Sequence, residues 1–261
     1  MDPANKVVVI TGAGSGIGRA LAIALHAAGA KAIVCVDLHQ AHAEETAAMI
    51  GASASANALD VADEAAIETL IAQTLSTHGR IDLFVSNAGY GIGGGLDLPT
   101  RDWQRMMDVH LWSHLAAARA VVPGMLEQGG GYLLNTASAA GLLTQLDSAP
   151  YAVSKHAAVA LAEWLAITYG DQGIGVSVLC PQAVRTAILG DAPKADSKRQ
   201  AAADGIMEPE TVAVECIEAM REERFMVLPH KEVATYFQRK ANDYERWLGG
   251  MRRFRRKLMG G

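Results

Sequence analysis

A tyrosine and a lysine four residues apart offer the clearest chemistry in this sequence. Tyr151 and Lys155 stand in a stretch with helical spacing, so both side chains occupy one face of a helix and the ammonium can lie beneath the phenol. A free phenol has a pKa of about 10, and a nearby positive charge favours the phenolate. The pair can therefore transfer a proton near neutral pH, while Ser138, which ends a predicted strand, can orient a substrate oxygen.

A glycine-rich stretch near the start of the chain has the pattern of a phosphate-binding turn. Residues 11–18 read Thr-Gly-Ala-Gly-Ser-Gly-Ile-Gly between a predicted strand and a predicted helix. Glycines let the backbone approach a pyrophosphate, and the N-terminus of the helix faces its negative charge. Asp37 ends the next strand, 19 residues after Gly18, where a carboxylate can accept hydrogen bonds from both hydroxyls of an adenosine ribose.

The same carboxylate indicates which of two dinucleotides the site prefers. Asp37 would repel the 2′-phosphate of NADP, and Ser15 and Leu38 occupy the positions where a basic partner for that phosphate is expected. We therefore expect NAD(H) rather than NADP(H). Asp60, after the third predicted strand, either contacts the adenine amino group or caps the helix that follows.

Short apolar runs alternate with longer helical patterns along most of the chain, which places these residues on a defined fold. The alternation predicts a doubly wound, mostly parallel seven-stranded α/β sheet of the Rossmann type, with helices on both faces. We expect a single domain over residues 1–248, followed by a basic tail over residues 249–261. Residues 187–206 are the most loop-like interruption. The predicted strands are 6–11, 32–37, one ending at Asp60, 81–86, 131–137, 174–180 and 225–228, and the predicted helices are 16–29, 41–50, 63–78, 101–128, 150–170 and 208–222.

Five motifs, in this order, resemble those of the short-chain dehydrogenase/reductase family. They are the glycine string 11–18, the Ser-Asn-Ala-Gly segment 86–89, Ser138, the Tyr151–Lys155 pair, and the Pro-Gln-Ala-Val-Arg-Thr segment 181–186. Tyr151 follows Ser138 by thirteen residues and precedes Lys155 by four, which is the family's catalytic spacing. The likeness spans about residues 5–230.

The resemblance implies an oxidoreductase that moves a hydride between a nicotinamide ring and a carbon bearing the substrate oxygen. Ser138, Tyr151 and Lys155 would be catalytic, with Tyr151 moving the proton and Lys155 holding the nicotinamide ribose and relaying the proton to solvent. The expected cofactor contacts are Gly12, Ser15, Gly16, Ile17, Gly18, Asp37, Asp60, Val61, Asn87, Ala88, Gly89, Tyr151, Lys155, Pro181, Val184 and Thr186.

The sequence departs from the family pattern at two positions. His110 stands where the family carries a catalytic asparagine, whose main-chain carbonyl holds a relay water. His110 can keep that function through its own carbonyl, or it can add a group that titrates near neutral pH. Gln182 replaces the usual glycine and predicts a changed loop near the nicotinamide.

The expected substrate pocket has apolar walls, which favours a hydrophobic secondary alcohol or its ketone as a small-molecule substrate. Some of its leucines can instead belong to the core, and Arg185 is the nearest candidate for binding an acidic group. Two other functions remain open: an NADPH-dependent reductase of ketoacyl type, and a non-catalytic NAD-binding module. The predicted wall residues are 91–95, Leu142, Leu143, Leu146, Ala183, Ile188 and Leu189.

Composition limits the partners and the compartment. A formal net charge of -5 argues against nucleic acid. The three cysteines lack the spacing of a metal or redox motif, and no cationic segment precedes an apolar stretch at the start, so we expect a cytoplasmic protein without a metal site. The basic tail favours a solvated segment or a contact between subunits over a membrane anchor. The resemblance implies a homotetramer or homodimer.

Overall fold

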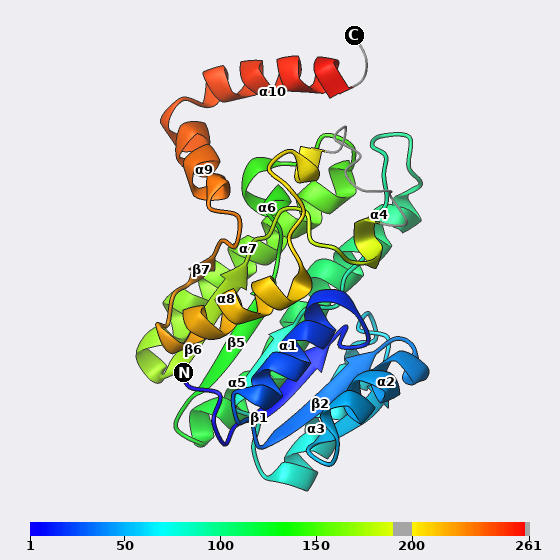
Figure 1. Ribbon diagram of the computed structural model, residues 1–261, viewed down its shortest axis with the longest axis vertical. Helices are drawn as coiled ribbons and strands as arrows, with labels where there is room; N and C mark the ends of the chain where they lie inside the picture. Colours follow the sequence, from blue (N-terminus) through cyan, green and yellow to red (C-terminus); the bar gives the residue numbers. More distant parts are fainter. Residues whose placement is uncertain (190–199, 259–261) are drawn as a thin grey trace.

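The computed structural model describes residues 1–189 and 200–258. Within these residues, seven parallel strands form one sheet in the order β3-β2-β1-β4-β5-β6-β7, with helices on both faces (Figure 1). The predicted doubly wound, single-domain α/β fold is therefore confirmed. The strands are β1 (Val7–Thr11), β2 (Ala32–Asp37), β3 (Ala54–Ala58), β4 (Leu83–Ser86), β5 (Gly131–Thr136), β6 (Ile174–Leu179) and β7 (Met226–Val227).

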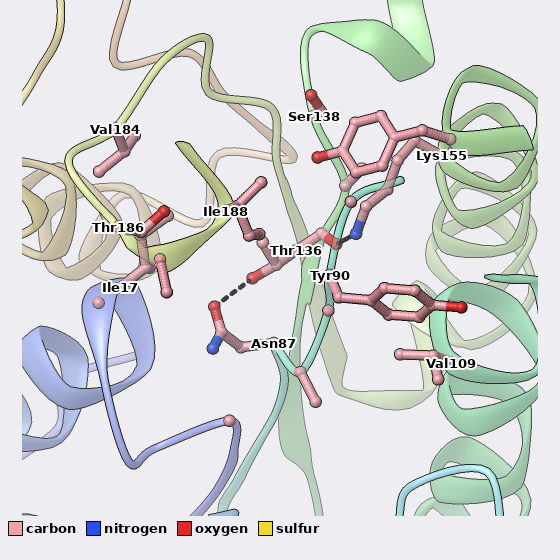
Figure 2. Close-up of a pocket in the computed structure, with 18 of the residues that line it drawn as sticks. Ile17, Asn87, Tyr90, Val109, Thr136, Ser138, Lys155, Val184, Thr186 and Ile188 are labelled. Atoms are coloured by element: carbon pink, nitrogen blue, oxygen red, sulfur yellow. Dashed lines mark hydrogen bonds between the residues drawn. The ribbon is translucent and has the colours of Figure 1, made fainter. Parts of the chain in front are cut away.

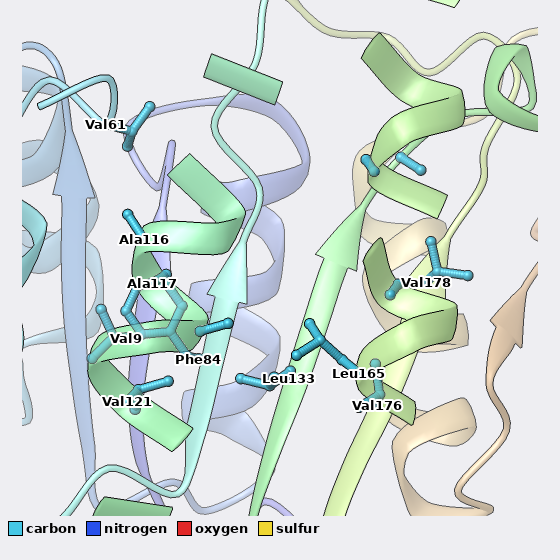
Figure 3. Close-up of a cluster of buried hydrophobic side chains, with 14 of the residues drawn as sticks. Val9, Val61, Phe84, Ala116, Ala117, Val121, Leu133, Leu165, Val176 and Val178 are labelled. Atoms are coloured by element: carbon cyan, nitrogen blue, oxygen red, sulfur yellow. The ribbon is translucent and has the colours of Figure 1, made fainter. Parts of the chain in front are cut away.

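Successive strand residues point into two separate apolar layers. Val9, Phe84 and Val178 belong to one layer (Figure 3), whereas Val8 and Ile10 belong to the other. Both faces of the sheet are buried, which explains why most strands read as continuous apolar runs. Helices α3 (Glu64–His78), α5 (Ser113–Glu127) and α7 (Ala149–Tyr169) cover the first face, and α1 (Gly16–Ala27), α2 (Gln40–Ile50) and α8 (Pro209–Arg221) cover the second.

The helix predicted over residues 101–128 is interrupted. It consists of α4 (Thr100–Met107), a π-helical turn at Asp108–Trp112, and α5. Such turns widen the helix by one residue and occur frequently at functional sites. His110 lies in this turn, so the position that departs from the family pattern also has an unusual backbone.

Two helices near the end of the described chain were not predicted. They are α9 (Glu232–Asn242) and α10 (Tyr244–Leu258), and the predicted boundary between domain and tail, after residue 248, falls inside α10. Figure 1 shows both helices at the same end of the molecule as α6 (Ala140–Leu143). Parts of the predicted loop 187–206 and tail 249–261, namely residues 190–199 and 259–261, lie outside the described residues.

Strand and helix ends otherwise follow the predictions to within a few residues. The third strand ends at Ala58 rather than at Asp60, and the fourth begins at Leu83 rather than at residue 81. No helix in the described part of the chain is long and apolar enough to cross a lipid bilayer.

Candidate active site

A cavity of about 740 Å³ lies at the carboxyl ends of the strands. It occupies the region where β1 is flanked by β2 and β4, the point at which strand order reverses and ligands bind in such sheets. Every predicted cofactor residue except Gly18 lines this cavity, as do three of the four predicted catalytic residues, all but His110. Residues far apart in the sequence thus meet around one space.

The glycine loop makes one wall of the cavity and fits a pyrophosphate. Gly12 has a φ of +66°, which side chains rarely adopt, and a Cβ at Gly14 would lie 2.6 Å from Oδ2 of Asp37. Ser15 is the N-cap of α1, and its side chain accepts no hydrogen bond from the N–H groups in the first turn of this helix. Free N–H groups at a helix N-terminus bind anions, so the loop can hold the phosphates of a dinucleotide.

Asp37 lies beside this loop at the end of β2. Its Oδ2 accepts the Gly14 N–H at 3.0 Å and its Oδ1 accepts the His39 N–H at 3.1 Å, which fixes the carboxylate at the cavity wall. The remaining lone pairs can accept ribose hydroxyls. Arg19 is the cation next to this loop, but it forms an ion pair with Glu45 at 2.7 Å. The residues present therefore fit an adenosine ribose that carries free hydroxyls.

Asp60 lines the same cavity but does not cap the following helix. Arg105 Nη2 lies 2.9 Å from each of its carboxylate oxygens. Burial raises the pKa of Asp60, but hydrogen bonds from Ala62 and Arg105 outweigh it and hold the pKa below its usual value. The cap of α3 is Asp63, whose side chain accepts the Ala66 N–H. Of the two alternatives for Asp60, the capping role is wrong and the adenine contact stays a prediction.

A hydrogen-bond network joins the loop to the centre of the site. Thr11 Oγ1 accepts the N–H groups of Asn87 and Ala88 at 2.9 and 3.1 Å, and Asn87 Nδ2 donates to the Thr11 carbonyl at 3.0 Å. Thr136 Oγ1 donates to Asn87 Oδ1 at 3.2 Å (Figure 2). This network fixes the segment after β4, which the sequence predicted would support a cofactor.

Ser138, Tyr151 and Lys155 meet at the far end of the cavity. Ser138 follows β5, and Tyr151 and Lys155 lie in the first two turns of α7. Ser138 Oγ accepts the Ala140 N–H at 3.1 Å. Lys155 Nζ donates to the Thr136 carbonyl at 2.9 Å and lies 5.8 Å from the centroid of the Tyr151 ring. Figure 2 shows the Lys155 amine directed at Thr136, with the Ser138 hydroxyl nearby.

The pKa values of these two side chains are shifted by burial. Burial raises the pKa of the Tyr151 phenol, and the neighbouring Ser138 hydroxyl only partly offsets this effect. Burial also lowers the pKa of Lys155 to about 7. Among the protein's own groups, burial has the largest effect on the pKa of Tyr151. The expectation that Lys155 together with the positive charge of an oxidised nicotinamide brings this pKa towards neutrality stays a prediction.

His110 lies behind the site rather than in the cavity. Its Nε2 accepts the Tyr90 N–H at 3.2 Å, so the proton of the neutral ring is on Nδ1, which lies 2.9 Å from Ser154 Oγ. The Ser154 hydroxyl in turn donates to the Tyr151 carbonyl at 3.1 Å. Burial, with a smaller effect of Lys155, lowers the pKa of His110 well below its usual value. The alternative in which His110 titrates near neutral pH is therefore wrong.

The loop after β6 carries the second departure. The Gln182 N–H donates to His230 Nδ1 at 3.2 Å, and its Nε2 donates to Asp204 Oδ2 at 3.0 Å. Gln182 therefore ties this loop to the segments before α8 and α9, as expected for a changed loop. Arg185 does not line the cavity and forms an ion pair with Glu208 at 2.7 Å, so it is not placed to bind an acidic substrate.

The predicted substrate wall is correct in part. Gly91, Ile92, Gly93, Ala183 and Ile188 line the cavity. Leu142 is buried in the core, as in the alternative given for the leucines, whereas Leu143 is buried and also lines a second cavity. The prediction is wrong for Gly94, Gly95 and Leu146, which do not line the cavity, and the Leu189 side chain lies outside the described part of the chain.

Comparison with known proteins agrees with this geometry. The family model for short chain dehydrogenases matches residues 6–197. The chain belongs to the short-chain dehydrogenase family. As a member, it is an oxidoreductase that acts on a CH–OH group with a nicotinamide cofactor.

Relatives of this short-chain dehydrogenase act on different alcohols. The 1-deoxy-11-beta-hydroxypentalenate dehydrogenase of Streptomyces exfoliatus is 35% identical over 87% of this chain and 84% of that protein. The cyclohexanol dehydrogenase of Acinetobacter sp. is 31% identical over 80% of this chain and 85% of that protein. A short-chain dehydrogenase/reductase from Burkholderia phymatum, in complex with NAD, matches with a TM-score of 0.84 and 31% identity over 94% of this chain and 96% of that chain.

Several residues of this short-chain dehydrogenase site were not predicted from the sequence. Thr136 accepts a hydrogen bond from Lys155, and Ser154 donates one to the first turn of α7. Two further residues, Tyr90 and Arg105, line the cavity. Ser154 lies between Tyr151 and Lys155 in a segment the sequence did single out, so its position was the available signal. The other three contacts depend on which strands are neighbours, which no local pattern reveals.

Proposed function

We propose that this short-chain dehydrogenase interconverts a hydrophobic secondary alcohol and its ketone with NAD(H). The observation that carries the proposal is the single cavity that joins Asp37 and the glycine loop to Ser138, Tyr151 and Lys155. One end of it offers N–H donors and a carboxylate for a dinucleotide, and the other offers proton-transferring groups. Apolar residues such as Ile188 line the space between, which suits a substrate without charged groups.

The preference for NAD is supported by charge. Asp37 accepts hydrogen bonds from the ribose hydroxyls, whereas its negative charge would repel a 2′-phosphate. Arg19 does not reverse this preference, because Glu45 already neutralises it. When bound, NAD supplies the acceptor for the hydride. Asp60 and Val61 would hold the adenine, and Val184 and Thr186 would hold the nicotinamide carboxamide.

Three side chains carry the proton chemistry. In the oxidation direction, the Tyr151 phenolate takes the hydroxyl proton of the alcohol. The carbon that bears this oxygen gives up its hydride, and a C=O bond forms. Ser138 donates a hydrogen bond to the same oxygen and orients it. Lys155, whose pKa is about 7, exchanges the proton of Tyr151 with solvent. His110 acts as a positioning residue, because it supports the turn of α7 that carries Tyr151.

Assembly and location complete the proposal. Val153, Trp164 and Ile167 on α7 are 50%, 54% and 83% exposed, a set of apolar side chains that a homodimer or homotetramer would cover. By contrast, most of the alanine-rich stretch 116–122 is buried against the sheet and is not free to form such a contact. A cytoplasmic location is supported by three buried free cysteines, Cys35, Cys180 and Cys216.

The test is hydride transfer measured by the near-ultraviolet absorbance of NADH. Wild-type protein is assayed with NAD and NADP separately against hydrophobic secondary alcohols, beside Tyr151→Phe and the control Tyr169→Phe at the other end of α7. NAD-linked turnover that is lost only in Tyr151→Phe is the expected result. Turnover that survives in Tyr151→Phe would overturn the assignment, and a preference for NADP would favour the ketoacyl-type alternative. Cofactor binding without turnover would favour the non-catalytic module.

A further inference from the structure

A second cavity adjoins the catalytic serine. It has a volume of about 360 Å³, and Ser138, Gln145 and Gln182 line both cavities. Its other walls come from α6, from residues 200–204 and from α9 and α10. The two cavities are therefore adjacent, on either side of the residue that would hold the substrate oxygen.

The helix α10 closes this space with its apolar side. Trp247, Met251 and Phe254 repeat at intervals of four and three residues, so they share one face, and all three are half-buried and line the cavity. The basic residues 252, 253, 255, 256 and 257 are exposed. Ala140 and Leu143 of α6 complete the wall.

One charged group at its rim, Asp204, is already paired within the protein. The Asp204 carboxylate accepts hydrogen bonds from the Tyr236 hydroxyl and from Gln182 Nε2, both at 3.0 Å. The Arg239 guanidinium lies 6.0 Å from the centroid of the Tyr236 ring. The Asp204 charge is thus satisfied without a ligand, and an apolar group is the chemistry that fits the remaining surface.

We propose that this second cavity holds a large apolar substituent of the substrate, next to the carbon whose oxygen Ser138 and Tyr151 bind. The inference rests on the proposed function and narrows it to secondary alcohols with a bulky apolar side. A cavity of about 150 Å³ accepts one benzene molecule, so 360 Å³ has room for roughly a two-ring group or an alkyl chain of similar volume.

The wall residues that decide this specificity lie outside the family's shared region. The family model ends at residue 197, whereas Trp247, Met251 and Phe254 lie in α10. The substrate named for a relative therefore says little about the group that fits here.

Two alcohols with the same reacting carbon test the proposal: methyl naphthyl carbinol and sec-butanol. Wild type should prefer the naphthyl compound by about 100-fold in kcat/KM, since several apolar groups each contribute severalfold. Trp247→Ala and Phe254→Ala should each lower that ratio by about tenfold. Leu248→Ala is the matched control, because Leu248 is the next residue of α10, is 42% exposed and does not line the cavity.

Binding separates this inference from the proposed function. Calorimetry with methyl naphthyl ketone and NAD involves no turnover, because both are already oxidised, and the affinity for the ketone should fall in Trp247→Ala but not in Leu248→Ala. If Trp247→Ala and Leu248→Ala have the same ratio of kcat/KM for the two alcohols and the same affinity for the ketone, the inference is overturned, even if both alcohols are oxidised. Absence of NAD-linked oxidation in wild type, together with ketone binding that depends on Trp247, would overturn the proposed function and leave this binding site supported.

Discussion

Replacing His110 by alanine tests whether this histidine positions Tyr151 without titrating. The change removes two hydrogen bonds, to the Tyr90 N–H and to Ser154 Oγ, each contributing about 1 kcal/mol. It also leaves the Tyr90 donor unpaired and creates a void, because His110 is 0% exposed. Together these effects predict a loss of about 3–5 kcal/mol in the free energy of unfolding. For a protein of this size, the melting temperature should fall by roughly 10 °C.

Activity and stability should respond differently to pH. The pKa of His110 is lowered in the folded state, so the unfolded chain binds a proton near pH 6.5 that the folded protein excludes. Stability is therefore lost as pH falls below that value. The His110→Ala variant should lose stability less steeply with acid than wild type. His114, with a pKa of about 3, keeps part of the slope in both proteins.

The kcat of the same variant should fall by about 10–100-fold with little change in KM for NAD, since a small misplacement of Tyr151 suffices. The midpoint of its pH–rate profile should not move. His156→Ala is the control, because His156 Nδ1 bonds only to the Ala152 carbonyl of its own helix in the described structure. A wild-type rate profile with a midpoint near pH 6.5 that disappears in His110→Ala would refute this reasoning.

Three further predictions concern the proton, the cofactor and the core. Because burial raises the pKa of Tyr151, alcohol oxidation should increase about tenfold per pH unit above neutrality while ketone reduction stays flat; an oxidation rate independent of alkaline pH would contradict this. Asp37→Asn should weaken NAD binding about tenfold and strengthen NADP binding, measured by calorimetry with Asp63→Asn as control; unchanged NADP affinity would count against the assignment. Phe84 is 1% exposed, so Phe84→Ala should lower the free energy of unfolding in urea by about 3–5 kcal/mol. A loss below about 1 kcal/mol would contradict this prediction and show that neighbouring side chains fill the void.

The fold was predictable because its signals are local. Each strand of the first half is a short apolar run, and each helix repeats apolar residues at helical spacing between turn residues. The glycine loop and Asp37 were also predictable, since a strand, a turn and a helix N-terminus are contiguous in sequence. Tyr151 and Lys155 needed only the spacing of one helical turn.

The contacts that tune the site were not predictable, because they depend on distant neighbours. Nothing local indicates that Lys155 donates to the Thr136 carbonyl, or that Arg105 forms an ion pair with Asp60. The effect of burial on the pKa of Tyr151 was missed for the same reason: the spacing shows that an amine is near, whereas burial depends on everything packed around the phenol. The π-helical turn at His110 likewise has no sequence signature.

The helix α10 was missed although its pattern was present. Its apolar residues recur at helical intervals from 244 to 258, but five basic residues within them suggested a solvated tail. A charged face and an apolar face coexist on one amphipathic helix, so charge density alone did not exclude structure.

Reaction and substrate selection therefore occupy different parts of this short-chain dehydrogenase. Hydride and proton transfer depend on residues up to Thr186, all within the region that the family model matches. The second cavity combines residues of that region, from Ser138 to Gln182, with residues from Gln200 to Phe254, which lie beyond it. Gln182 connects the two, because it lines both cavities and bonds to Asp204 and His230. A substitution at Gln182 should consequently alter substrate preference more than the kcat for a small alcohol, whereas one at Tyr151 should abolish turnover of every alcohol alike.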